Sequence, residues 1–167
     1  MKHLKYFLFF SLVFTISLKS CSVQKLNTNK TPKIGTTYQG GILFYLLQEG
    51  DIGYISGELH GLVVSPSDQS SEIEWGCFGT RIKGANRTDV GTGAQNTLAI
   101  LTGCNETQIA ARVCDELVLG GYDDWFLPSK DELNLLYLNK DLITNLGDFY
   151  YWSSSGYGGF NGWGQDF

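Results

Sequence analysis

The chain has 167 residues, of which 12 are basic and 17 acidic, and 43% of all residues are hydrophobic. This length and composition fit one folded domain with a real core, and they argue against a disordered chain. An acidic surface repels phosphate backbones, so nucleic acid is excluded as an expected partner.

The N-terminus predicts export. A basic start with Lys2 and Lys5 precedes an apolar run at 6–18, which is short for a membrane span and fits the core of a secretory signal. The next residues, Leu18-Lys19-Ser20-Cys21, resemble a bacterial lipobox, in which the cysteine is lipidated and becomes the mature N-terminus. An ordinary signal peptide, with Cys21 as a free or bridged thiol, is the alternative.

Three regions are therefore predicted: a lipoprotein signal peptide at 1–20, a flexible polar tether at 21–33 and one domain at 34–167. Loss of the signal leaves nine basic and 17 acidic residues, a net charge of −8.

The first half of the domain predicts two strands. Apolar runs at 41–48 and 62–64 are typical of buried strands, and the Gly and Asp content of 49–53 predicts a turn after the first. Residues 67–82 carry Trp75-Gly76-Cys77 and predict irregular structure.

Two helices are predicted next. Gly91-Thr92-Gly93 opens the first, with Leu98 and Leu101 on its apolar side. Asn105 or Thr107 caps the second, which ends near 120–121. Its apolar stripe follows the spacing i, i+3, i+4 and i+7: Ala110, Val113, Cys114 and Leu117.

The third helix follows an aromatic run, Trp125-Phe126-Leu127, that is typical of a strand. Ser129 and Glu132 form an S-x-x-E capping box that opens this helix. A second aromatic, strand-like run covers 150–155. Helices held between strand runs predict the α+β class.

Seven motifs follow one another along 38–167: Tyr38-Gln39-Gly40-Gly41-Ile42, His60-Gly61-Leu62-Val63, Trp75-Gly76-Cys77, Gly91-Thr92-Gly93, Asp124-Trp125-Phe126-Leu127-Pro128-Ser129, Glu132-Leu133 and Tyr151-Trp152-Ser153-Ser154. In this order they resemble the family named for the C-terminal domain of the Legionella collagen-like adhesin. The resemblance implies a C-type lectin-like fold, with a small irregular antiparallel sheet, two to three helices and long loops. It also implies a binding protein of the bacterial surface, since the family's named member is an adhesin for host glycans and matrix.

Two departures from that family shape the expectations. Family domains continue beyond the stretch that matches 162–167, so the domain is expected to be C-terminally truncated and to lack its last strand, which leaves an open sheet edge. The tripeptides by which sugar-binding C-type lectins hold calcium are missing. Asp123 and Asp124 remain weak calcium candidates, because they lack the alternating oxygen spacing of a calcium loop.

The cysteines allow one bridge besides Cys21. Export permits disulfides, and Cys77–Cys104 is the favoured pair, with Cys104–Cys114 as the runner-up. Cys114 lies on the apolar stripe and is expected to be buried. An enzyme related to the formylglycine-generating group would need a cysteine pair near the C-terminus, but no cysteine follows Cys114. His60, the only histidine after the signal, has no nucleophile motif beside it.

The expected function is binding or adhesion without catalysis, at the periplasmic face or the cell surface, by a protein anchored to the membrane through a lipid on Cys21. Trp152 is expected in the core. Tyr157, Asn161 and Trp163 are the candidate ligand-binding residues, for a glycan or another extracellular ligand, because aromatic faces stack on sugars and amides bond hydroxyls. An enzyme of the same fold group and a purely structural envelope component are the alternatives.

Overall fold

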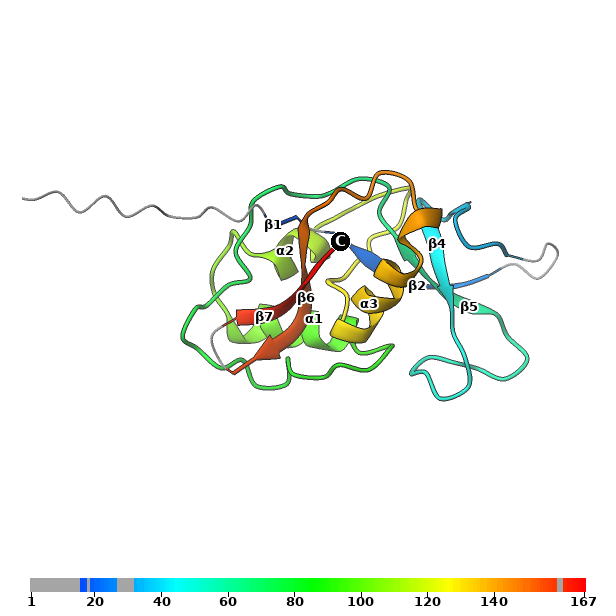
Figure 1. The fold of residues 1–167 in the computed structure, drawn as a ribbon. Coiled ribbons are helices and arrows are strands. Elements are labelled where there is room, and N and C mark those ends of the chain that lie inside the picture. The colour runs from blue at the N-terminus through cyan, green and yellow to red at the C-terminus, as the bar shows by residue number, and fades with distance from the viewer. Residues whose placement is uncertain (1–15, 18, 27–31, 159–160) are drawn as a thin grey trace, which may run out of the picture.

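The computed structural model describes residues 16–17, 19–26, 32–158 and 161–167. These residues form two small sheets and three helices, and α3 lies between the hairpin β6–β7 and the sheet that contains β4 and β5 (Figure 1). The presence of both helices and antiparallel strands agrees with the predicted α+β class. No helix within the described ranges is long and apolar enough to cross a membrane.

The larger sheet is antiparallel and has the order β2-β5-β4-β3. Its strands are β2 (Cys21–Lys25), β3 (Thr37–Tyr38), β4 (Gly41–Leu46) and β5 (His60–Val64). Successive residues of β4 point to opposite faces, so Ile42 and Phe44 join one hydrophobic cluster while Leu43 joins another with Trp125. Because both faces are covered, this strand is a continuous apolar run, as the sequence predicts.

The flexible tether predicted at 21–33 is wrong for residues 21–25, which form β2. All five of its residues pair with β5, and Leu26, just beyond it, is 3% exposed among Leu43 and Val63. Lys19 is 1% exposed, and its Nζ lies 3.2 Å from the carboxylate of Asp68. Polar side chains made residues 21–33 look like a tether, but pairing with β5 satisfies the backbone of 21–25, and the ion pair with Asp68 satisfies Lys19, which belonged to the predicted signal peptide. Residues 27–31 of the expected tether lie outside the described residues.

The smaller sheet has the order β1-β6-β7, with β1 (Ile16–Ser17), β6 (Tyr150–Tyr157) and β7 (Asn161–Asp166). The strand predicted at 150–155 is thus confirmed as β6. Residues 161–166, the stretch where the resemblance ends, form β7, which pairs antiparallel with β6. The strand that was expected to be missing would follow this stretch, so that expectation stays a prediction. Phe167 is buried, with its ring centroid 4.7 Å from that of Tyr151 and 5.4 Å from that of Tyr137. The chain's final residue therefore contributes to the core.

Helices α1 (Gly93–Gly103) and α2 (Ala110–Asp115) form where predicted but differ in detail. Leu98, expected on the apolar side of α1, is 65% exposed. The buried side of α1 carries Asn96 and Thr97, because their side chains bond to loop backbone rather than to apolar groups. Helix α2 has only six residues and begins after Ile109, so the caps predicted at Asn105 and Thr107 and the end near 120–121 are wrong.

Helix α3 (Lys130–Leu138) begins with the predicted capping box, which is confirmed: Ser129 Oγ accepts from the backbone N–H of Glu132, and the Glu132 carboxylate accepts from that of Ser129. A short 3₁₀ helix, η1 (Lys140–Leu142), follows it. The Glu132 carboxylate also accepts from the N–H of Gly91 at 2.8 Å. One buried carboxylate thus ties the start of α3 to the loop that precedes α1.

Because the Glu132 carboxyl is buried, we expect the stability of the fold to depend on pH. Burial raises its pKa from 4.5 to about 6, although the backbone N–H groups of Ser129, Gly91 and Gly93 oppose the rise. The folded state therefore binds a proton that the unfolded state lacks between these values, so stability falls as pH rises through this window, by about 2 kcal/mol in total. Urea unfolding at a series of pH values measures this change.

The matched control for this experiment is Glu116→Gln, because Glu116 is an exposed residue beside α2. Glu132→Gln is expected to lose the stabilisation on acidification, whereas Glu116→Gln keeps it. The same pH slope in Glu132→Gln as in the wild type contradicts the assignment.

The three serines that follow Trp152 on β6 are all buried, and they serve the fold. Ser155 Oγ donates to the carbonyl of Arg87 at 2.6 Å and accepts from the N–H of Lys130 at 2.9 Å. Ser154 Oγ accepts from the Asn96 amide. The hydroxyls therefore join β6 to α1 and to the start of α3, which explains the Trp-Ser-Ser run in structural terms.

Candidate functional site

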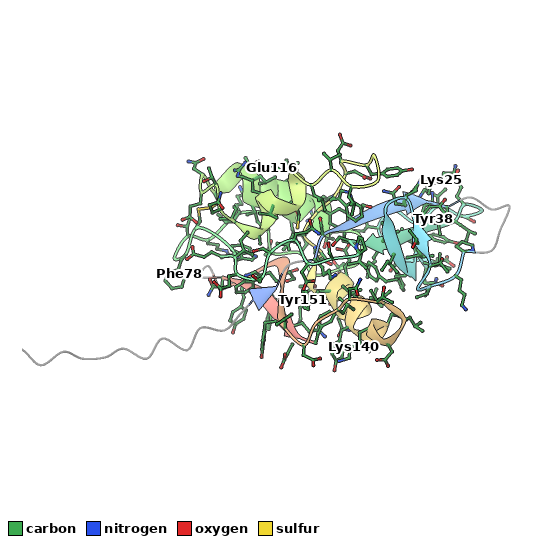
Figure 2. The ribbon with its side chains drawn as sticks, turned by 90° about the horizontal axis from the view of Figure 1, so that it is seen from above. Lys25, Tyr38, Phe78, Glu116, Lys140 and Tyr151 are labelled. Carbon is green, nitrogen blue, oxygen red and sulfur yellow. A yellow bond between two sulfur atoms is a disulfide. The ribbon has the colours of Figure 1, made fainter. Side chains whose placement is uncertain are left out.

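The described part of the chain contains an open cleft of about 830 Å³, called here the Trp152 cleft. Its walls come from the irregular segment at 69–78, the start of α2, and strands β6 and β7. The residues used below are Glu72, Glu74, Phe78, Gln108, Trp152 and Asn161. Phe78 projects at the end of the molecule opposite Lys25 and Tyr38 (Figure 2).

Aromatic rings form the floor and walls of the Trp152 cleft. Trp75 is 4% exposed, and its indole N–H donates to the carbonyl of Ser153 at 2.9 Å. Trp152 is half-buried rather than in the core as expected, and its N–H donates to the carbonyl of Ile73. Phe78 is 76% exposed. Because both indole N–H groups are already bonded, the rings offer their apolar surfaces to a ligand.

Gly162 on β7 allows this strand to approach Trp75, which forms the floor of the cleft. A Cβ at Gly162 would collide with the indole of Trp75 and approach the carbonyl of Ser153. Only a residue without a side chain lets β7 lie directly over Trp75, which brings Asn161 to the mouth of the cleft. The sequence alone does not show that Gly162 lies against Trp75.

The polar groups of the Trp152 cleft are mostly free to bind. The carboxylates of Glu72 and Glu74 and the side-chain amides of Gln108 and Asn161 have no hydrogen bond or ion pair with any described residue. Exposed polar groups beside apolar ring surfaces are what an amphipathic ligand needs.

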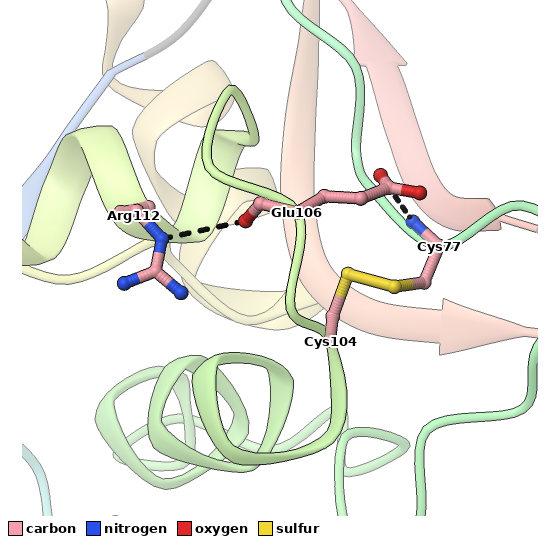
Figure 3. The surroundings of a disulfide bond; sticks show 4 residues. All are labelled: Cys77, Cys104, Glu106 and Arg112. Carbon is pink, nitrogen blue, oxygen red and sulfur yellow. Dashed lines mark hydrogen bonds between the residues drawn. A yellow bond between two sulfur atoms is a disulfide. The ribbon is translucent and has the colours of Figure 1, made fainter.

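A disulfide closes one side of the cleft. Cys77 and Cys104 are bonded, which confirms the favoured pairing, and Cys114 is buried as predicted. Glu106 reinforces the link: its carboxylate accepts from the N–H of Cys77 at 2.8 Å, and its carbonyl accepts from Arg112 Nε (Figure 3). Because Cys77 lies between Gly76 and Phe78, and Gln108 follows shortly after Cys104, the bridge holds two walls of the cleft together.

Of the three residues predicted to bind ligand, Asn161 and Trp163 line different hollows, and the binding role of all three stays a prediction. Asn161 lines the Trp152 cleft. Tyr157 and Trp163 pack on each other, with ring centroids 4.6 Å apart, and Lys130 Nζ lies 4.4 Å from the Trp163 ring. Trp163 lines a separate, smaller hollow of about 430 Å³ beside the start of α3. Tyr157 pairs with Asn161 across the β6–β7 hairpin and Trp163 lies two residues further along β7, so strand alternation puts all three on one face, but only Asn161 lines the Trp152 cleft.

The calcium candidates Asp123 and Asp124 are exposed, and the Asp124 carboxylate accepts from the Gln24 amide. Among the residues described, one group brings three potential metal ligands together, at Cys77, Cys104 and Glu106. Its two sulfur atoms are joined in the disulfide, so this group does not fit a metal ion.

The thiol of Cys21, the predicted lipidation site, is inside the core. Cys21 is 2% exposed, and its backbone exchanges hydrogen bonds with Phe126 at 2.8 and 2.7 Å. Burial raises the pKa of this thiol well above its usual value, so it is held neutral and unreactive. A lipid on this sulfur and the docked strand β2 therefore exclude one another.

His60 belongs to a surface ion cluster. Its Nε2 lies 3.0 Å from the carboxylate of Glu58, which Lys25 Nζ approaches at 2.8 Å. No serine, threonine or cysteine side chain in the described ranges bonds to His60. This arrangement supplies no nucleophile for a histidine base.

Sequence reasoning missed Phe78, Gln108, Glu72 and Glu74 as cleft residues. Phe78 alone carried a signal, since it is a large aromatic residue between a cysteine and a glycine in a segment without regular structure. In comparisons with known proteins, no family model matches the chain, and no curated protein or solved structure shows significant similarity to it.

Proposed function

We propose that this protein is a non-catalytic binding module of the bacterial cell envelope, and that the Trp152 cleft holds its ligand, a glycan or another extracellular molecule. The observation that carries the proposal is the combination of exposed ring surfaces, at Phe78 and Trp152, with the free amides of Gln108 and Asn161. Sugars present apolar ring faces and hydroxyl edges, which match these two kinds of surface.

The proposal includes a lipid anchor at Cys21, as the lipobox-like residues suggest. In such a protein the lipid is attached while β2 is not docked on β5, because the docked thiol is buried. The anchored form then lacks Lys19 and holds its first residues away from β5. The binding cleft does not depend on this choice, since none of its lining residues comes from β2.

A glycan array followed by calorimetry on its best ligand tests the site. Phe78→Ala and Gln108→Ala are expected to weaken binding about tenfold each, the effect of losing one well-placed contact. The full chain is kept in a sugar-free zwitterionic detergent, so that no detergent head group competes for the cleft.

Two substitutions serve as controls. Leu138→Ala removes another exposed apolar side chain, on α3 and outside the cleft lining, and is expected to leave affinity unchanged. Trp163→Ala tests the second aromatic surface. A loss of binding with Trp163→Ala but not with Phe78→Ala moves the site to the Tyr157–Trp163 pair and contradicts the assignment to the Trp152 cleft.

A further inference from the structure

The charge of the Trp152 cleft narrows its ligand class. We infer that the cleft selects a saccharide that carries a free amine, such as an oligomer of glucosamine, over its neutral and acidic counterparts. This inference rests on the proposed function and goes further, since it names the charge and the chemical group that the site recognises.

The ionisable side chains that line the cleft are both acidic, Glu72 and Glu74. Neither carboxylate has a hydrogen bond or ion pair with a described residue, so neither is neutralised within the described part of the fold. Arg112 on α2 does not line the cleft, and its Nε donates to the carbonyl of Glu106. Arg81 lines a second hollow of about 350 Å³, which shares Trp75 and Asn161 with the cleft.

These charges favour a cationic ligand for two independent reasons. The carboxylates attract an ammonium group and repel a carboxylate or sulfate. The exposed ring of Phe78 and the indole of Trp152 attract a cation through their π faces. Both effects act on the ammonium group of the ligand. A sugar that carries this group also brings its own ring to the aromatic side chains of the cleft.

The remaining features favour a saccharide over a basic peptide. A peptide that binds in extended form adds to an exposed strand edge. Along the 69–78 wall, the carbonyl of Glu74 already accepts from the N–H of Ala110, and β7 contributes only its first residue, Asn161. The cleft offers ring surfaces and amides instead, which suit sugar rings and hydroxyls.

Calorimetry on the full chain in sugar-free detergent tests the inference with two trisaccharides of the same linkage, one of glucosamine and one of N-acetylglucosamine. At about pH 6 an alkyl amine is charged. We expect the glucosamine trimer to bind at least about tenfold more tightly, and this preference to shrink at high salt. The double variant Glu72→Gln, Glu74→Gln is expected to lose the preference, while Glu116→Gln keeps it.

The outcomes separate this inference from the proposed function. Equal affinity for the two trimers overturns the amine preference and leaves a neutral glycan site standing. Failure of the wild type to bind either trimer also overturns the inference, while the array decides the proposed function separately. Tri-lysine binding as tightly as the glucosamine trimer overturns the saccharide in favour of a basic peptide.

Discussion

Replacement of Asp68 by asparagine is expected to destabilise the full chain by about 2–3 kcal/mol. Lys19 is 1% exposed, and Asp68 is its only ion-pair partner among the described residues. Burial lowers the pKa of Lys19, and the charge and hydrogen bond of Asp68 oppose this change. Removing one partner of a fully buried pair costs roughly 3–5 kcal/mol, and the 24% exposure of Asp68 reduces that effect.

Asparagine is the right substitution because it keeps an acceptor for the Tyr151 hydroxyl, which donates to the Asp68 carboxylate. Urea unfolding measures the change. The control is the same substitution in a chain that begins at Cys21 and therefore has no Lys19, where the effect is expected to fall below about 0.5 kcal/mol. An equal loss in both chains contradicts the role of Lys19.

This result also bears on the anchor. If the protein in cells carries a lipid on Cys21, it has no Lys19, and Asp68→Asn leaves its stability unchanged. Cys21→Ser then releases the protein from membranes. Membrane association that survives Cys21→Ser contradicts lipid attachment at this residue.

Loss of the Cys77–Cys104 bridge is expected to cost about 3–4 kcal/mol. The two cysteines are 27 residues apart, and closing a loop of this length lowers the entropy of the unfolded chain by that amount in the chain-entropy model. A whole domain is stable by only about 5–15 kcal/mol, so the change is large. Urea unfolding with and without a phosphine reductant measures it, and the reductant is applied under partly denaturing conditions.

The double variant Cys77→Ser, Cys104→Ser is the control, because the reductant is expected to leave its stability unchanged. The same variant is expected to bind the cleft ligand less tightly, since Gly76 and Phe78 on one side and Gln108 on the other lose their covalent link. Unchanged affinity in a folded double variant means that the bridge supports the fold alone.

The sequence by itself determined the elements whose signals are local. Strand β4 is a continuous apolar run because both of its faces are covered, and the Ser129–Glu132 capping box opens α3 where its spacing predicts. The burial of Cys114 followed from helical periodicity, and the favoured Cys77–Cys104 pair from the position of both residues outside regular elements. Apart from the disulfide, whose cysteines are 27 residues apart, each of these signals lies within a few residues of its consequence.

The tertiary structure alone decided the rest, because the deciding contacts join distant residues. Residues 19–24 became a mostly buried segment through Asp68 and β5, and α1 turned Asn96 and Thr97 inward because they bond to loop backbone. The Trp152 cleft is formed by residues from 69–78, α2 and the β6–β7 hairpin, so no local sequence pattern predicts it. Hydrophobic periodicity predicts which apolar residues are buried. It does not predict the burial of polar groups whose partners lie far along the chain.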